Sequence, residues 1–326
     1  MAVSVIDSIG PALNRTGHIL FKPFNIGKWF TLGFCAWLAN LMGGGFNGSF
    51  NTGYRGGPGG GGAPVGGGGP DIDGVWDFFQ EHMAAIIAVG IIAVLTLWAI
   101  GLLLLWLSSR GQFMFLDGVA RNRSAVVQPW REFRELANSL FWFRFVLGLI
   151  GLAGAIVISG LGLAIAWADI AAREFGGMAI ASMVISGLLF LVFGIVMAVI
   201  GALLRDFVVP VMYLRNVKAL YAWRIFRYEV ARGYFWNFVL FYLMGFLLGL
   251  AIGIMAAIAT CVTCCIAALP YIGTVILLPL FVFIRCYPLY FLRQFGPEWD
   301  VFPAEPVLVA PMPPPPVPGR PPMPPQ

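Results

Sequence analysis

Long apolar runs alternate with short charged segments along the chain. Five runs approach or exceed the roughly 20 residues that a helix needs to cross about 30 Å of hydrocarbon, and their interiors hold no Asp, Glu, Lys, Arg or His. A sixth and shorter run follows Lys28, whose long side chain can reach the membrane interface. In the last run, Pro270 suits a first helical turn. The six predicted spans are 29–42, 84–107, 145–168, 177–204, 236–259 and 268–284.

An eighteen-residue segment occurs twice, each time leading into an apolar run. Residues 130–147 and 223–240 are identical at seven of these eighteen positions. After the second, fourth and sixth spans the chain passes an arginine and ends a short segment on aromatic-Leu; we call these the exit segments, 112–116, 210–215 and 288–293. Internal similarity indicates duplication. We therefore expect an all-α polytopic membrane bundle of about six transmembrane helices in three repeated hairpins, with amphipathic cytoplasmic helices between them.

The distribution of positive charge predicts the orientation. With six spans, 18 of the 20 Lys and Arg residues lie on one side of the membrane, and only Arg55 and Arg173 lie on the other. Cytoplasmic loops carry the excess of Lys and Arg, so both termini are expected in the cytoplasm. The predicted location is the inner (plasma) membrane, crossed several times.

Composition separates three further parts from the membrane domain at 29–295. Residues 1–28 carry apolar positions at helical spacing and are expected to form a cytoplasmic interfacial segment. Residues 43–70 are rich in glycine and predict a flexible extracytoplasmic loop. Residues 296–326 are rich in proline and predict a disordered cytoplasmic tail that can dock partners.

Overall composition excludes a water-soluble globule. Charged residues make up 11% of the chain and the mean hydropathy is +0.86, whereas a soluble domain has about 25% charged residues. The histidines, His18 and His82, fall on opposite sides of the membrane, so no catalytic Ser-His-Asp or Cys-His set is expected. We predict a protein that is not an enzyme, has no cofactor or metal, and binds no nucleic acid.

Three stretches resemble a known group of proteins. These are LFKPFNIGKWFTLGF at the first span, the Arg-rich segments before the third and fifth spans, and FVVPVMYL after the fourth. Over residues 15–295 the chain resembles bacterial six-helix integral membrane proteins of unassigned function, which are similar to the membrane domain attached to some glycerophosphodiester phosphodiesterases. The acidic metal ligands of the soluble phosphodiesterase domain are absent from this sequence. The resemblance implies an inner-membrane protein of unassigned function, related to lipids and without hydrolase activity.

The duplicated segment supplies the candidate ligand site. Two pairs of arginines three residues apart, each preceded by tryptophan, are expected on one helix face at the cytoplasmic surface. Such a face can hold anionic lipid headgroups, at about 1 kcal/mol per basic residue; alternatively the arginines only anchor the topology. Nearby glutamates weaken the lipid interpretation. The candidate headgroup residues are Arg131, Arg134, Arg224, Arg227, Trp130 and Trp223.

Small residues follow one face of the fifth span. Gly245, Gly249 and Gly253 recur every four residues, which lets another helix approach closely. Packing inside the bundle is the preferred interpretation, and a homo-oligomer face is the alternative. Cys261, Cys264 and Cys265 at the outer end of this span are interpreted as small packing residues, with metal binding or a disulfide less favoured.

Two classes of function remain. The first is a protein that handles or binds lipids or other amphiphiles at the cytoplasmic leaflet, with membrane lipids as its partners. The second is a membrane scaffold or assembly protein that uses the glycine stripe and the Pro-rich tail to hold other proteins.

Overall fold

A computed structural model describes residues 4–22, 24–42, 72–172, 176–262 and 270–302. These residues are helical with no strand, apart from an isolated bridge between Phe21 and Phe24, which confirms the all-α prediction. The predicted glycine-rich loop 43–70 and residues 303–326 of the Pro-rich tail lie outside the described residues.

The main helices, in chain order, are α1 (Ile9–Phe21), α2 (Ile26–Asn40), α4 (Ile72–Ala120), α5 (Val127–Glu132), α6 (Arg134–Ala172), α7 (Gly177–Leu203), α8 (Val209–Arg215), α9 (Ala219–Ile225), α10 (Phe235–Val262), α11 (Pro270–Ile276) and α12 (Leu278–Arg293). Shorter turns are η1 (Ile6–Ser8), η2 (Leu204–Val208), η3 (Phe226–Val230) and η5 (Pro297–Trp299), of which η2 and η3 are π-helical.

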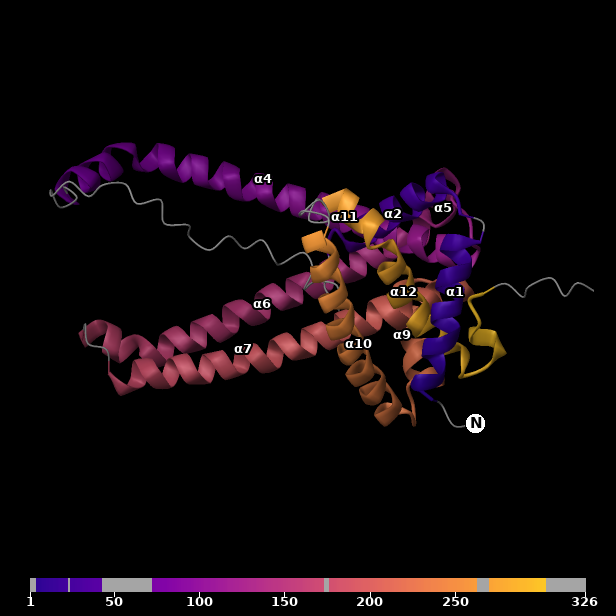
Figure 1. Cartoon of the computed structure of the whole chain (residues 1–326). Helices are drawn as coiled ribbons and strands as arrows, with labels where there is room; N and C mark the ends of the chain where they lie inside the picture. Colours follow the sequence, from indigo (N-terminus) through magenta and orange to yellow (C-terminus); the bar gives the residue numbers. More distant parts are fainter. Residues whose placement is uncertain (1–3, 23, 43–71, 173–175, 263–269, 303–326) are drawn as a thin grey trace, which may run out of the picture.

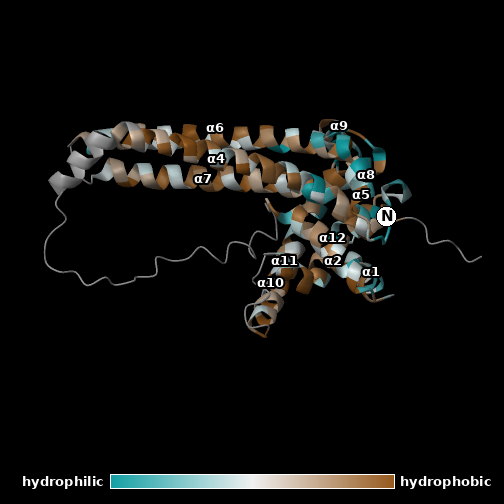
Figure 2. Ribbon diagram, turned by 90° about the horizontal axis from the view of Figure 1, so that it is seen from above, coloured by the Kyte–Doolittle hydropathy of each residue, from teal (hydrophilic) through white to brown (hydrophobic). Residues whose placement is uncertain are grey.

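The short helices and the adjoining ends of the long helices lie together at one end of the molecule, which we call the body (Figure 1). The buried hydrophobic cluster is formed by residues of these elements, among them α1, α2, α8 and α12. From this body α4 and the α6–α7 hairpin extend as long arms, while α10 points in another direction. The arms are apolar along most of their length (Figure 2), and their outer side chains are exposed in the protein alone. The exit segments, expected to leave the membrane, instead supply much of the core of the body. Their buried members include Phe113, Met114, Phe115, Leu116, Val211, Met212, Leu289, Phe291 and Leu292.

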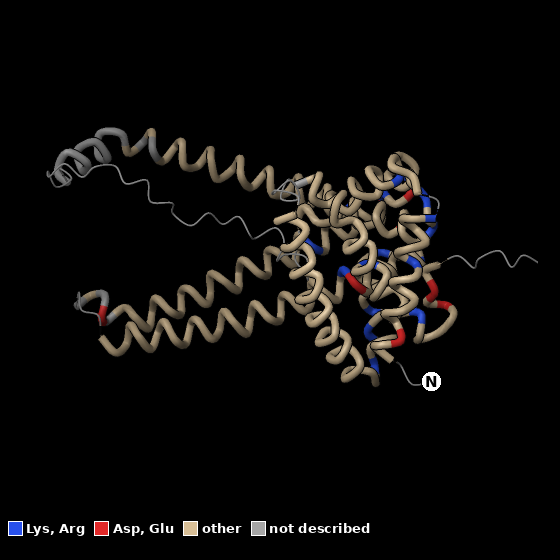
Figure 3. Tube along the Cα trace, in the orientation of Figure 1, with Lys and Arg blue, Asp and Glu red and all other residues tan. Residues whose placement is uncertain are grey.

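Four of the six predicted spans correspond to helices long and apolar enough to cross a membrane. They are Ile87–Ala120, Arg134–Trp167, Gly177–Arg215 and Phe235–Val262. The parts of these helices that lie outside the body carry no Lys or Arg, as Figure 3 shows; Lys and Arg of the described residues gather in the body.

The first and sixth predicted spans are shorter than expected. Helix α2 has 15 residues, or about 22 Å at 1.5 Å per residue, less than the hydrocarbon thickness. Helix α11 begins at Pro270, as predicted, but ends at Ile276 after 7 residues. The chain bends at Leu277 before α12 starts. The count of six spans is therefore not confirmed. Both segments are apolar because they pack in and beside the body, a cause that composition cannot distinguish from contact with lipid.

Helix pairing follows the predicted hairpins only in part. Helices α2 and α4 pack closely and antiparallel; a Cβ on Gly111 would come within 2.6 Å of the backbone of Leu38. Helices α6 and α7 form a long hairpin closed by Asp169, whose carboxylate accepts the N–H of Ala179 at 2.8 Å. Helices α10 and α12 meet only near the body, because α11 packs on α2 instead.

The terminal segments are folded onto the body. One face of α1 packs against α12 and buries Ala12, Ile19 and Leu20, whereas Leu13 stays exposed. Lys28 does not reach out to the interface as predicted: its ammonium donates to the carbonyl of Ile19 and to Asn122. Burial lowers the pKa of Lys28, and the positive charge of Arg15 adds to this effect.

The predicted tail, 296–326, also begins with residues that are folded. Residues 297–302 belong to the body, since Trp299 is 2% exposed and the ring of Phe302 stacks on Tyr290 with centroids 4.6 Å apart. The packed residues therefore continue to Phe302, past the predicted boundary at 295. These contacts involve large aromatic side chains in a segment that proline content alone marked as unfolded.

Candidate functional site

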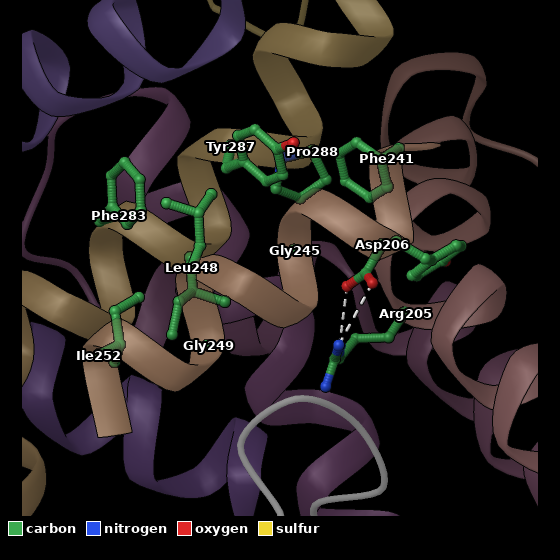
Figure 4. A pocket seen from close by; sticks show the side chains of 12 residues that line it. Arg205, Asp206, Phe241, Gly245, Leu248, Gly249, Ile252, Phe283, Tyr287 and Pro288 are labelled. Atoms are coloured by element: carbon green, nitrogen blue, oxygen red, sulfur yellow. Dashed lines mark hydrogen bonds and ion pairs between the residues drawn. The ribbon is translucent and has the colours of Figure 1, made fainter. Parts of the chain in front are cut away.

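A buried ion pair lies where α7 enters the body. Arg205 and Asp206 are neighbours in the π-helical turn η2. Arg205 donates from Nε to Oδ1 of Asp206 at 2.8 Å and from Nη2 to Oδ2 at 3.2 Å. This two-point arrangement, drawn in Figure 4, matches a guanidinium fork to a carboxylate and is the strong form of such a contact.

Pro210 explains why a second arginine comes to this place. In a π-helical turn the carbonyl of one residue accepts the N–H five residues later, which for Arg205 is the position of Pro210. Proline has no N–H, so the carbonyl of Arg205 needs another donor. Arg285 of α12 supplies it from Nη1 at 2.9 Å. This bond joins α12 to the end of α7, although the two residues are 80 positions apart.

Positive charge exceeds negative charge around this pair. Arg144 of α6 donates from Nη1 to the Ser108 hydroxyl at 3.3 Å, and its charge is close enough to Arg205 for the two to repel. Arg285 interacts in the same way with Arg205 and is attracted by Asp206. Arg205 and Arg285 thus both interact with Asp206, and Arg144 is a third positive charge close to Arg205; such an excess of positive charge favours an anion.

A first cavity, of about 40 Å³, occupies the wedge between α10 and α12. Close to the body, Phe241 of α10 stacks on Tyr287 of α12 with centroids 4.7 Å apart. Beyond this contact the helices separate, and Gly245 and Gly249 have no side chains to fill the space (Figure 4). Arg205 and Asp206 make one end of the cavity polar, and the remainder is mostly apolar. Its lining comprises Arg205, Asp206, Phe241, Tyr242, Gly245, Leu248, Gly249, Ile252, Phe283, Ile284, Tyr287 and Pro288.

A second cavity, of about 30 Å³, lies on the other side of the ion pair. It is bounded by α2 and α4 as well as by α12, and it is more polar than the first. The two cavities share Arg205, Asp206 and Ile284, so they adjoin at the ion pair. The lining of the second cavity comprises Ala39, Asn40, Gln112, Phe115, Arg205, Asp206, Phe281, Ile284 and Arg285.

The predicted headgroup arginines lie elsewhere, on the surface of the body. Arg131 and Arg134 are exposed, but they do not share one continuous helix as expected: α5 ends before Phe133 and α6 begins after it. The break occurs because the buried Phe133 ring packs on Phe113 and Tyr213. Arg224 and Arg227 are also exposed, at the end of α9 and in η3. In the described part of the chain, no hydrogen bond or ion pair links the two arginine pairs.

The two predicted tryptophans are half-buried and belong to aromatic contacts of the body. The guanidinium of Arg110 lies between the rings of Trp130 and Trp106, 4.6 and 4.5 Å from their centroids. Trp223 stacks on Phe143 with centroids 6.0 Å apart. These rings hold the duplicated segments against the long helices.

The remaining candidates are placed as follows. Gly245 and Gly249 of the predicted packing stripe line the first cavity, and Gly253 follows one turn later on α10. Cys261 is exposed and free, whereas Cys264 and Cys265 lie outside the described residues. Over the ranges that the structure describes, no three His, Cys, Asp or Glu side chains gather to hold a metal ion.

In the sequence, Arg205 and Arg285 stand out only as the arginines that precede two exit segments, and neither Arg144 nor Asp206 was predicted to be part of a site. The local signal was an Arg-Asp pair at the end of an apolar run, followed by proline at the fifth position after the arginine. No local signal could show that Arg285, on another helix, completes the arrangement.

Residues 3–282 match a family described as a family of unknown function (DUF7544). No curated protein and no solved structure matches the chain. The resemblance to the membrane domain attached to glycerophosphodiester phosphodiesterases is therefore neither supported nor contradicted, and it stays a prediction. The matched residues extend from η1 into α12 and include the Arg205–Asp206 pair and most of the body. The chain belongs to this family, DUF7544.

Proposed function

We propose that this protein is a non-enzymatic membrane protein that binds one anionic amphiphile, of the class of membrane lipids, in the wedge between α10 and α12. The observation that carries the proposal is the first cavity. An ion pair lies at one end of it, and the rest is lined mostly by glycine, leucine, isoleucine, phenylalanine and proline, together with two tyrosines. A molecule with a charged headgroup and an apolar chain matches this arrangement, with the headgroup at the ion pair and the chain in the apolar part.

The surroundings of the wedge support a membrane lipid as its ligand. The outer faces of the long helices expose large apolar side chains, which in a membrane lie against acyl chains. The wedge lies beside the end of α7 that carries Arg205, on the positively charged side that sequence assigns to the cytoplasm. A lipid of the cytoplasmic leaflet therefore has its headgroup at the height of the three arginines. In this proposal Arg131, Arg134, Arg224 and Arg227 attract anionic lipids to the surface of the body without forming the specific site.

Filling the wedge tests the proposal. We expect that Gly249→Leu places a branched side chain in the first cavity and lowers retention of an anionic lipid at least about tenfold, or about 1.4 kcal/mol of binding free energy. The measurement is native mass spectrometry of protein released from nanodiscs that contain phosphatidylglycerol and phosphatidylcholine. The wild-type protein is expected to carry one phosphatidylglycerol.

A matched control is Gly194→Leu on α7, where an added Cβ meets nothing within 4 Å. This variant makes the same change of residue on an open helix face and is expected to retain the lipid. Equal retention by the wild-type protein and both variants would show that the wedge does not hold the lipid, and would refute the proposal.

The scaffold function is the second candidate, and the isolation of the α4 arm favours it. The outer part of α4 exposes Ile87, Val89, Ile92, Val94 and Leu95, each more than half exposed, and the arm stands apart from α6 and α7 in Figure 1. A second copy of the chain or another membrane protein could cover this arm, with the Pro-rich tail as an additional docking segment.

For a scaffold we expect deletion of residues 303–326 to reduce the amount of co-purifying protein several-fold, because the tail holds partners through its prolines. Quantitative mass spectrometry after purification in mild detergent measures this. An unchanged set of partners would contradict the scaffold function and leave lipid binding as the explanation of the exposed arms.

A further inference from the structure

Arg205 and Arg285 differ in how their guanidinium groups are used. The side of the Arg205 guanidinium formed by Nε and Nη2 is filled by the two oxygens of Asp206. In Arg285, only Nη1 has a partner, the carbonyl of Arg205. The same side of Arg285, Nε and Nη2, has no hydrogen-bond partner among the described residues. We call this pair of N–H donors, Nε and Nη2, the fork. The fork of Arg205 is thus occupied by a carboxylate, and the fork of Arg285 is free.

The free fork is deeply buried. Arg285 is 7% exposed, and both of its unpartnered nitrogens are shielded from solvent. A buried donor without a partner costs about 1–3 kcal/mol and more when it is charged, so folded proteins rarely leave one unsatisfied. A guanidinium also stays protonated under all ordinary conditions, so it cannot escape this cost by losing its proton.

Arg285 also lines the second cavity. The cavity volume of about 30 Å³ suffices for about two water-sized atoms, which equals the two oxygens that one carboxylate or phosphate presents to an arginine. Gln112, which is 4% exposed, lines the same cavity, and its Oε1 has no partner within the described structure. A protonated phosphate oxygen or a water molecule would satisfy this acceptor.

We propose that the Nε–Nη2 fork of Arg285 binds one oxyanion, a carboxylate or phosphate group, in the second cavity. The inference rests on the proposed function in one respect: in an amphiphile this oxyanion is the headgroup, and the apolar chain runs past Ile284 into the first cavity. Free inorganic phosphate has the same chemistry and is the other source of the group. Arg144 and Arg205 add positive charge nearby.

Two variants test the fork itself. Arg285→Lys keeps the charge but removes the side-on pair of donors, so binding of the oxyanion is expected to fall at least about tenfold. Gln112→Glu introduces a carboxylate into the lining of the second cavity. It is expected to supply the missing anion from within the chain and to abolish binding, while the protein unfolds at the same or a higher temperature. The control is Arg293→Lys, a change at a half-exposed arginine on the same helix whose partner is Asp300 at 3.0 Å.

Two probes distinguish the sources of the oxyanion. Dioleoyl phosphatidic acid is presented in phosphatidylcholine nanodiscs and its retention is measured by native mass spectrometry. Inorganic phosphate is added to the protein in a neutral maltoside detergent, and the shift in unfolding temperature is compared with that caused by chloride at equal ionic strength. We expect the wild-type protein and Arg293→Lys to retain one phosphatidic acid, and Arg285→Lys and Gln112→Glu to lose it.

Each other outcome has one meaning. If only inorganic phosphate binds, and binding depends on Arg285 and Gln112, then the oxyanion site stands and the proposed function fails. If the lipid is lost in Gly249→Leu but retained in Arg285→Lys and Gln112→Glu, then the proposed function stands and the fork does not hold the headgroup. If neither probe responds to these variants, water alone fills the second cavity and the inference is refuted.

Discussion

Replacing Asp206 by asparagine is expected to lower the free energy of unfolding by about 3–5 kcal/mol, the usual cost of removing one partner of a buried ion pair. In the described structure Asp206 pairs with Arg205 and attracts Arg285, and Arg144 lies close enough to Arg205 to repel it. Without Asp206 three positive charges repel one another in a poorly solvated place, and the fork of Arg205 loses its second acceptor. Thermal unfolding of the purified protein in detergent, followed by circular dichroism, measures the change.

The control for this prediction is Asp7→Asn, which removes the same charge from an exposed position in η1. It is expected to change the unfolding temperature little. Added inorganic phosphate is expected to restore part of the stability of Asp206→Asn, since an anion at Arg285 offsets the lost charge. Equal unfolding temperatures for the two variants would contradict the electrostatic role assigned to Asp206.

Replacing Asp117 by asparagine is the second change with a large expected effect, a loss of about 2–3 kcal/mol. Its side chain is fully buried and accepts from Tyr213 at 3.0 Å and from Arg123 at 2.8 Å, with Arg121 at 3.3 Å. The hydrogen bond to Asp117 raises the pKa of Arg123, so the interaction favours the charged form. The expected loss is smaller than for Asp206, because Arg121 and Arg123 are partly exposed and water can solvate them once the carboxylate is gone.

The comparison for Asp117 is Glu298→Gln. Glu298 pairs with Arg215 at 2.7 Å, but both side chains are exposed, and such pairs contribute about 0–1 kcal/mol. Chemical denaturation is expected to show a clearly larger loss in the free energy of unfolding for Asp117→Asn than for Glu298→Gln. A loss for Asp117→Asn no larger than that for Glu298→Gln would show that the Asp117 cluster does not hold α4 to α8.

The long helices could be predicted from sequence because their signal is local. An uncharged run such as 177–204 has one stable arrangement in a membrane, and hydropathy identifies it. The same criterion does not establish whether α2 and α11–α12 cross the membrane, since a residue that faces the core and a residue that faces lipid are equally apolar. For the same reason the sequence did not predict the burial of the exit segments, in which Phe113, Met212 and Phe291 are completely buried.

The candidate site depends on contacts between distant segments, and this is why sequence reasoning chose other arginines. Arg131 and Arg224 belong to an obvious repeat, but the structure leaves them on the surface. Arg205 and Arg285 have no repeated pattern around them beyond their place before an exit segment. Their meeting requires the missing N–H of Pro210 and the approach of α12 to the end of α7. Only the first of these conditions can be read from the sequence.

Photocrosslinking with a lipid tests most directly whether the wedge between α10 and α12 binds a lipid. Phosphatidic acid with a diazirine in its acyl chain is incorporated into nanodiscs with the protein, irradiated, and located by peptide mass spectrometry. If the acyl chain occupies the first cavity, crosslinks are expected to concentrate at Leu248, Ile252, Phe283 and Ile284, and Gly249→Leu is expected to remove them. Crosslinks spread over the outer faces of α4, α6 and α7, unchanged by Gly249→Leu, would contradict lipid binding in the wedge.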